Sequence, residues 1–314
     1  MVGGLLAAAG HRVTLIARGA HLEALQGRGL VLEEPGSTRT LRLEAVGHPS
    51  EVASWEQTTV LLTMKSQDTA AALGELAAVC PPETPVACLQ NGVDNERMAL
   101  RFFGEVVGAC VVCAATYVRP GVVQAHSDPA RGVFELGPYP SGTSATAGEL
   151  ADALNGAGFD AAVHQDVMRW KYAKLLTNLG NAVEVLCGPE ARTSDLARAA
   201  RQEGRAVLVA AGIDVATPAE EKERRARVSA LAPTASGPHR GGSSWQGAVR
   251  GSRGTETPYL NGEITLLGRL HGIPTPVNQA ILHLTTQMIG RGQSPGTIDP
   301  GAVLAAAGVP DGSR

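Results

Sequence analysis

Strand-like and helix-like patterns of apolar residues alternate through the first half of the chain. The strand-like runs are short and almost continuously apolar, and they occupy residues 13–17, 59–63, 85–89, 106–115 and 161–164. Apolar residues at helical spacing separate them, over residues 21–26, 69–79, 94–103 and 147–157. Because strands that are apolar on both faces are typical of sheets covered on both sides, this alternation predicts an α/β fold with a parallel sheet.

Two further stretches have the pattern of hairpins. The first pairs residues 29–34 with 40–45 around Pro35-Gly36-Ser37. The second pairs residues 122–125 with 133–136. Since Pro and Gly favour turns between such runs, we expect both hairpins to extend or decorate the sheet.

The pattern changes after residue 165, and no strand-like run recurs. Amphipathic stretches follow at residues 167–186, 194–212, 218–231, 258–271 and 276–289. A loop rich in Pro, Gly and Ser interrupts them at residues 233–242. We therefore predict two domains, a Rossmann-like dinucleotide-binding domain over residues 1–165 and an all-helical domain over residues 166–314.

The first residues have the pattern of the middle of a βαβ unit. A small, apolar helix precedes the turn at Gly10-His11, and a strand that ends at Arg18 follows. A dinucleotide-binding unit begins instead with a strand and a G-x-G-x-x-G turn. Only six residues separate Gly3 from Gly10, under two helical turns, so Gly3 and Gly4 are expected inside a helix that packs closely on the sheet. The first strand and the glycine turn would then precede Met1; the alternative is a chain that begins with a short helix.

Composition excludes several classes of function. The net charge of −3 offers no electrostatic case for nucleic-acid or membrane binding, and no apolar run is long enough to span a bilayer. The apolar start lacks a basic leader, so we expect a cytoplasmic protein. Cys110 and Cys113 form a CxxC pair inside an apolar run, which favours buried thiols over a zinc site, and we expect no metal.

Candidate cofactor-binding residues follow predicted strands. Arg18 ends the strand at which NAD enzymes usually place an acidic residue, and a basic residue suits the 2′-phosphate of NADP. The alternative is a solvated surface arginine. Lys65 and Asn91 each follow a strand, at the edge of a parallel sheet where ligands bind, so we expect both to face a cofactor.

Three polar residues form one stripe on a largely apolar helix. Lys174, Asn178 and Asn181 are spaced i, i+4 and i+7 among leucines. A lysine that merely extends its charge to solvent is the alternative. Because burying an unpaired ammonium is unfavourable, the two asparagines on its stripe favour a functional lysine.

The other half of a site would come from later in the chain. Ser244 supplies a hydroxyl after the flexible loop, and Glu256 precedes a helix that Pro258 can open at its first turn. Alone, Glu256 is a carboxylate favoured by the helix dipole. Beside a buried lysine it becomes an acid–base partner.

These pieces, in this order, resemble the ketopantoate reductase (2-dehydropantoate 2-reductase) family over nearly the whole chain. The resemblance rests on segments 10–18, 64–66, 90–92, 174–178, 243–244, 255–262 and 271–278. It implies an NADPH-dependent oxidoreductase that converts 2-dehydropantoate to pantoate in pantothenate biosynthesis, and it independently implies an incomplete N-terminus.

The resemblance also implies roles for residues of this chain. Lys174 matches the family's catalytic lysine, and Glu256 matches the acidic residue that assists it. Asn178, Asn181 and Ser244 are then substrate-binding residues, while Arg18, Lys65 and Asn91 bind NADP(H). A small 2-oxo acid is the expected partner, without nucleic acid or membrane, and a homodimer is compatible with the sequence.

This chain departs from the family pattern at three positions. Ala182, Gly241 and Pro258 stand where the family has two asparagines and an acidic residue. A paralogous reductase for another 2-oxo acid therefore stays open, as does another Rossmann-type dehydrogenase of the 3-hydroxy-acid or opine kind. A non-enzymatic or inactive relative that lacks the pyrophosphate-binding turn is the third alternative.

Overall fold

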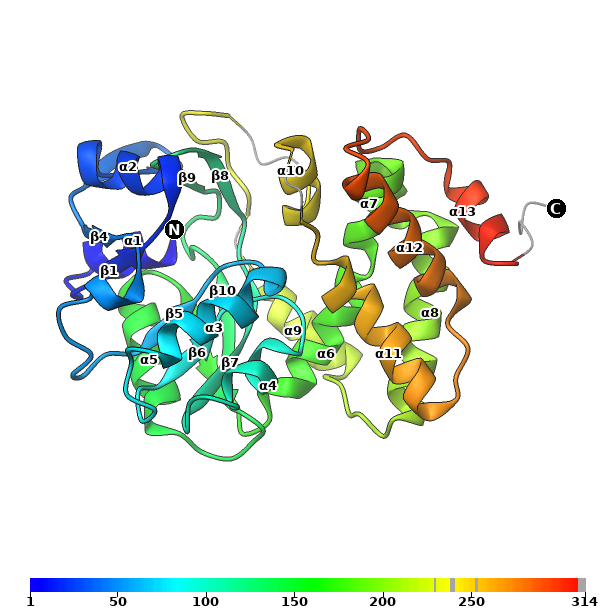
Figure 1. Cartoon of the computed structure of the whole chain (residues 1–314), viewed down its shortest axis with the longest axis horizontal. Helices are drawn as coiled ribbons and strands as arrows, with labels where there is room; N and C mark the ends of the chain where they lie inside the picture. Colours follow the sequence, from blue (N-terminus) through cyan, green and yellow to red (C-terminus); the bar gives the residue numbers. More distant parts are fainter. Residues whose placement is uncertain (229, 238–240, 252–253, 310–314) are drawn as a thin grey trace.

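The computed structural model describes residues 1–228, 230–237, 241–251 and 254–309. Strands gather in the part of the molecule built from the first half of the chain, and helices make up the other part (Figure 1). The last strand ends at Val163 and the next helix begins at Val167. The division into two domains at residue 165 falls between these elements and stays a prediction.

The largest sheet contains five strands in the order β11-β10-β7-β6-β5. Their bounds are Val60–Leu62 (β5), Val86–Cys88 (β6), Val106–Val112 (β7), Val133–Pro138 (β10) and Asp160–Val163 (β11). Strands β5, β6 and β7 are parallel as expected, but β10 runs antiparallel to β7. The α/β fold with a parallel sheet is therefore confirmed, with one antiparallel pair, because the chain leaves this sheet after β7 and returns from the opposite end.

A second sheet of four strands has the order β3-β2-β9-β8. Its strands are Leu30–Glu34 (β2), Ser37–Leu41 (β3), Ala115–Arg119 (β8) and Val122–Ala125 (β9). The hairpin of β2 and β3 is confirmed, but its second strand begins at Ser37, three residues earlier than expected, and ends at Leu41. The hairpin of 122–125 with 133–136 is wrong. The run 106–115 breaks after Val112, and β9 pairs with β8 while β10 pairs with β7.

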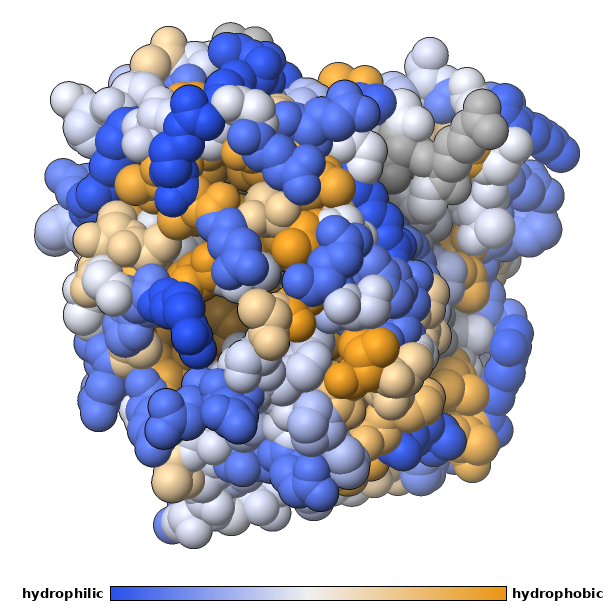
Figure 2. Space-filling model, turned by 60° about the vertical axis from the view of Figure 1, so that its left-hand side comes forward, coloured by the Kyte–Doolittle hydropathy of each residue, from blue (hydrophilic) through white to orange (hydrophobic). Residues whose placement is uncertain are grey.

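The first strand, β1 (Thr14–Ile16), pairs in parallel with β4 (Glu44–Val46) in a sheet of their own. Gly3 and Gly4 lie inside α1 (Val2–Ala8), and a Cβ on Gly4 would come within 2.7 Å of the Leu30 side chain. The close helix–strand contact is thus confirmed. Turned toward this side, the molecule shows apolar residues around a hollow (Figure 2). The strand and glycine turn before Met1 stay a prediction.

The remaining helices of this part connect its strands along the chain. They are α2 (Gly19–Arg28), α3 (Thr69–Ala77), α4 (Asn95–Ala99) and α5 (Ala145–Gly156). The expected helix over 94–103 is the least accurate of these, because it ends at Ala99.

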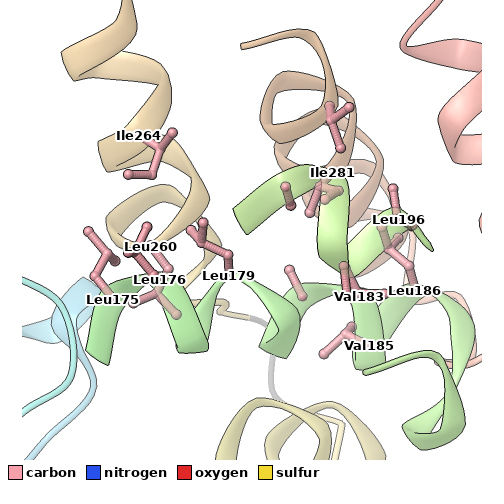
Figure 3. Packing of buried hydrophobic residues seen from close by; sticks show 14 of the residues in the cluster. Leu175, Leu176, Leu179, Val183, Val185, Leu186, Leu196, Leu260, Ile264 and Ile281 are labelled. Atoms are coloured by element: carbon pink, nitrogen blue, oxygen red, sulfur yellow. The ribbon is translucent and has the colours of Figure 1, made fainter. Parts of the chain in front are cut away.

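The helical part has a hydrophobic core of its own. Its helices are α6 (Val167–Asn178), α7 (Gly180–Cys187), α8 (Asp195–Ala210), α9 (Pro218–Ala226), α10 (Ser243–Val249), α11 (Asn261–His271), α12 (Pro276–Gly290) and α13 (Pro300–Ala306). Leucines and valines of α6 and α7 meet Leu260, Ile264 and Ile281 in this core (Figure 3). Helix α10 was not predicted from the sequence, and Pro258 lies in a short 3-10 turn before α11 rather than at the start of that helix.

The helix expected over 167–186 is broken at Leu179. Asn261 donates from Nδ2 to the Leu179 carbonyl oxygen at 3.2 Å and to Asn278 Oδ1 at 3.0 Å. Gly204 of α8 lies against the break, where a Cβ would come within 2.9 Å of Leu179. Because a buried asparagine amide satisfies a carbonyl at the break, two short helices replace one long one.

Candidate active site

Two strand-end loops are tied together at the carboxyl edge of β5 and β6. Asn95 donates from Nδ2 to the Asn91 carbonyl oxygen at 2.9 Å and to Ser66 Oγ at 3.1 Å. The Ser66 hydroxyl also donates to the Asn91 carbonyl, at 3.1 Å. Gln90 donates to the Met64 carbonyl oxygen at 2.9 Å and to Thr69 Oγ1 at 2.7 Å. This buried network fixes the position of Asn91.

A buried ion pair fastens α6 to the same edge. The Lys171 ammonium contacts the Glu96 carboxylate and donates to the carbonyl oxygens of Gln90 at 3.0 Å and Ala109 at 3.3 Å. Lys171 is 3% exposed and Glu96 is fully buried. Burial raises the pKa of the Glu96 carboxyl, and the Lys171 charge opposes that rise. The helix can approach closely because a Cβ on Gly108 would lie 2.9 Å from Val167.

Lys174 lies one helical turn after Lys171 and faces a cavity. Its ammonium donates to Asn91 Oδ1 at 2.8 Å and contacts the Val111 carbonyl oxygen. The cavity has a volume of about 290 Å³. Its polar and charged lining consists of Asn91, Lys174, Asn178, Asn181, Arg192 and Ser243, and the other lining residues are Leu89, Val111, Val112, Cys113, Ala115 and Gly242. The structure thus brings together Lys174 and all three asparagines singled out from the sequence.

The environment of Lys174 makes it a better acid than an ordinary lysine. Burial lowers its pKa below 10.5, and the nearby charges of Lys171 and Arg224 lower it further. A proton donor with a lowered pKa transfers its proton more readily near neutral pH.

Asn178 has an unsatisfied donor at this cavity. It is 6% exposed, and its Nδ2 makes no hydrogen bond among the described residues. Because a buried amide donor without an acceptor is unfavourable, this atom is suited to an oxygen of a bound molecule.

Asn181 belongs to a polar cluster at another part of the lining. Arg192 donates from Nη1 to Asn181 Oδ1 at 3.0 Å and to Glu184 Oε1 at 2.8 Å. The Gly242 backbone N–H donates to Glu184 Oε2 at 3.1 Å. A Cβ on Gly242 would come within 2.7 Å of that oxygen, so only glycine fits here without a shift.

Glu256 and Ser244 are buried near the site but do not line the cavity. Glu256 is 3% exposed, and burial raises the pKa of its carboxyl while the charges of Lys65 and Lys174 lower it. The structure describes no hydrogen bond between Glu256 and Lys174 among its described residues. Ser244 lies in the first turn of α10, next to the cavity-lining Ser243.

The two basic residues assigned to the cofactor lie at strand ends outside the cavity. Arg18 follows β1, and its side chain is 63% exposed and contacts Glu75. Lys65 precedes the short 3-10 turn over Ser66–Asp68. Both therefore border the carboxyl edge of the strands, as the sequence predicted.

Sequence reasoning missed four charged residues of this region. Glu96, Lys171, Glu184 and Arg192 are absent from the predicted site, and two of them are paired carboxylates buried in helices. A signal was present for Lys171, since it lies three residues before Lys174 and so shares a helix face with it. Nothing in the sequence showed that the helix would place both lysines against strand ends.

The sequence also raised the questions of a CxxC pair, a metal site and a membrane-spanning helix. Cys110 and Cys113 are free thiols: Cys110 is buried and donates to the Trp170 carbonyl oxygen, and Cys113 lines the cavity. Among the described residues, no group of three His, Cys, Asp or Glu side chains could hold a metal ion. No helix in the described part of the chain combines the length and apolar character needed to cross a bilayer.

Models of one known protein family match most of the chain. Residues 1–141 match the model of the ketopantoate reductase PanE/ApbA family, and residues 166–288 match the model of its C-terminal part. The 2-dehydropantoate 2-reductase of Pyrococcus horikoshii is 31% identical over 284 residues, which cover 88% of this chain and 90% of the relative. The same enzyme of Archaeoglobus fulgidus is 30% identical over 293 residues, with coverage of 90% and 92%.

Solved structures with the same fold are similar over almost the whole chain. A PanE/ApbA family ketopantoate reductase from Ralstonia eutropha superposes with a TM-score of 0.76 at 28% identity, covering 93% of this chain and 95% of that one. A D-mandelate dehydrogenase, solved with NADH and anilino(oxo)acetate, gives 0.77 at 22% identity with the same coverage. At that identity, the second likeness concerns the fold alone.

The Lys171–Glu96 pair generates a prediction about stability. Glu96→Leu leaves a buried ammonium without its counterion, so we expect the free energy of unfolding to fall by about 3 kcal/mol or more. The double variant Glu96→Leu with Lys171→Met removes both charges and should recover most of that loss. Chemical denaturation of both variants measures this; a double variant as unstable as the single one would contradict it.

Proposed function

We propose that this chain, which belongs to the ketopantoate reductase family, reduces 2-dehydropantoate to pantoate with NADPH. The observation that carries the proposal is a half-buried lysine beside an unsatisfied, buried asparagine donor at one cavity. Reduction of a carbonyl places negative charge on its oxygen, and an ammonium at that oxygen both stabilises the charge and supplies the proton. The curated relatives named above carry this activity in their names.

One residue of the cavity transfers the proton, and the others orient it or bind the substrate. Lys174 holds the carbonyl oxygen and donates a proton from Nζ, and its lowered pKa makes the transfer easier. Asn91 orients the ammonium through its Oδ1. Asn178 donates to a substrate oxygen, and Ser244 and Asn181 are retained as substrate-binding residues.

Glu256 is proposed to assist the lysine by its charge. Its carboxyl lies close enough for Lys174 to lower its pKa, although no hydrogen bond joins the two in the described residues. A nearby carboxylate favours the protonated form of Lys174 and so favours its reprotonation after each turnover.

The residues present fit the two ends of a nicotinamide dinucleotide, which supplies the hydride when it is bound. At one end, Asn91 faces the same cavity as Lys174. At the other end, Arg18 leaves its Nε and Nη1 without a hydrogen bond to the described residues and is mostly exposed. A free guanidinium edge suits a phosphate, so Arg18, with Lys65 beside the sheet edge, is proposed to hold the 2′-phosphate of NADP. Residues 1–19 contain no G-x-G-x-x-G turn.

A homodimer and a cytoplasmic location stay proposals that rest on the sequence. The described part of the chain contains no helix suited to span a membrane, and the substrate is a small molecule.

The catalytic lysine generates the first functional prediction. Lys174→Met removes the proton donor at nearly constant volume, so we expect kcat to fall roughly 10²–10⁴-fold. Binding of NADPH, followed by its fluorescence, should change little because Arg18 and Lys65 are untouched. Full activity of the variant would refute the mechanism, and absence of saturable NADPH binding by the unaltered chain would favour an inactive relative.

The lowered pKa of Lys174 generates a prediction about pH. Because the protonated lysine is the active form, kcat should decline as pH rises through its lowered pKa. Initial rates across alkaline pH at saturating substrate test this, and a rate that declines only near the pKa of an ordinary lysine would contradict it.

Arg18 generates a prediction about cofactor choice. Arg18→Ser should lower the ratio of kcat/KM for NADPH to that for NADH by about tenfold, because one charge-assisted contact to the 2′-phosphate is lost. Arg12→Ser is the matched control, since Arg12 is exposed before β1 rather than after it. An equal ratio in both variants would remove Arg18 from the cofactor site.

A further inference from the structure

Three arginines lie along one flank of α8, outside the residues that the proposed reaction uses. Arg198, Arg201 and Arg205 are spaced i, i+3 and i+7, so they share one face of the helix. Arg198 is paired with the Asp195 carboxylate. The guanidinium groups of Arg201 and Arg205, by contrast, have no acceptor among the described residues. The helix therefore presents two unpartnered positive charges as neighbours on its surface.

A fourth arginine joins this group from the turn before α8. A Cβ on Gly180, the first residue of α7, would lie 3.6 Å from Arg192 Cγ and 3.7 Å from Arg201 Nη1. The side chains of Arg192 and Arg201 thus lie over the same glycine. Arg192 makes its hydrogen bonds through Nη1, and its Nε and Nη2 have no acceptor within the described part of the chain. One edge of this guanidinium is therefore free.

The charges that act on Arg201 are all positive. Burial lowers the pKa of the Arg201 guanidinium, and the charges of Arg205, Arg192 and Arg198 lower it further. Glu203, the acidic residue of α8 between Arg201 and Arg205, instead accepts from backbone N–H groups at the start of α12. Because like charges repel in a partly desolvated cluster, an anion bound between these arginines would relieve the repulsion.

The number and shape of the donors favour a phosphate group over a carboxylate. A guanidinium binds an anion through parallel N–H groups in a planar fork. Arg192, Arg201 and Arg205 together bring three such forks. A phosphate group carries a charge of about −1.5 to −2 at pH 7 and three strong acceptor oxygens, whereas a carboxylate carries one charge on two oxygens. The phosphate group therefore satisfies more of these donors and balances more of their charge.

We infer that Arg201, Arg205 and the free edge of Arg192 form a binding site for a phosphate group, next to the active-site cavity but outside it. Arg192 also lines the cavity, so the two sites share this side chain. A bound phosphate cancels positive charge beside the cavity, and an anionic 2-oxo acid is then attracted less strongly. The expected effect is a raised KM for the 2-oxo acid. The binding site stands by itself, while this effect rests on the proposed function.

The first test measures binding without turnover. Inorganic phosphate is titrated into the full chain by calorimetry, with the ionic strength held constant by chloride. We expect saturable binding, and Arg201→Gln should weaken it about tenfold because one charged donor is lost. Arg101→Gln is the matched control, since Arg101 is an exposed arginine after α4 in the other part of the molecule, and it should bind phosphate like the unaltered chain.

Two results of this titration would overturn the site. One is the absence of saturable binding by the unaltered chain. The other is equal binding by the unaltered chain and Arg201→Gln, which would make Arg201 a solvated surface charge.

A second titration distinguishes free phosphate from a phosphate ester. Methyl phosphate carries the same anionic group on a small organic stem. If inorganic phosphate binds at least as tightly, free phosphate is the ligand, and tighter binding of methyl phosphate indicates a phosphomonoester. Either result supports the site when Arg201→Gln weakens it, and a loss of neither affinity in that variant refutes the site.

A kinetic test separates this site from the 2′-phosphate of NADP. Arg201→Gln should keep the ratio of kcat/KM for NADPH to that for NADH, and a fall like the one expected for Arg18→Ser would assign the arginines to the cofactor and refute a separate site. Added phosphate should raise KM for 2-dehydropantoate in the unaltered enzyme more than in Arg201→Gln, and an equal rise would refute the effect on the reaction. A chain that binds phosphate through Arg201 but reduces no 2-oxo acid would keep the site and refute the proposed function.

Discussion

The buried pair of Lys171 and Glu96 is the interaction on which the arrangement of the site depends. Both charges are out of water, and the ammonium also donates to two backbone carbonyl oxygens, one just after β6 and one within β7. A buried ion pair contributes little net stability, but it tolerates almost no displacement because either charge alone is unfavourable. The pair therefore fixes the rotation and position of α6 on the sheet, and Lys174 follows one turn later.

Beyond this pair, the cavity depends on hydrogen bonds between polar groups rather than on apolar packing. The Ser66, Asn91 and Asn95 side chains and backbone join two loops from separate strands. The break at Leu179 lets Asn181 and Glu184 leave the direction of α6, and Glu184 then meets Arg192 and α10. Through Arg250, α10 also donates to the Tyr117 carbonyl oxygen of β8. The cavity is thus enclosed by segments far apart in the sequence, each held by satisfied polar contacts.

Much of the fold followed from local patterns in the sequence. Apolar periodicity located most strands and helices, because burial on one or two faces leaves a regular trace along the chain. It failed where pairing was decided over long distances. The antiparallel placement of β10 and the separation of β8 from β7 depend on which strand edges are free, and the run of apolar residues is the same in either arrangement.

The sequence by itself determined the chemistry available: a lysine and two asparagines at helical spacing, a basic residue at a strand end, and a polar residue after each central strand. Such features are local, because helix period and strand ends are local properties. Only the tertiary structure decided which of these groups meet. The fold hydrogen-bonds Lys174 to Asn91 and leaves Glu256 and Ser244 outside the cavity lining. It also brings two ion pairs to the site that the sequence had not indicated, Lys171–Glu96 and Arg192–Glu184. Charges become paired or unpaired only when burial and distance are set by the whole fold, and that information is not carried by any short segment.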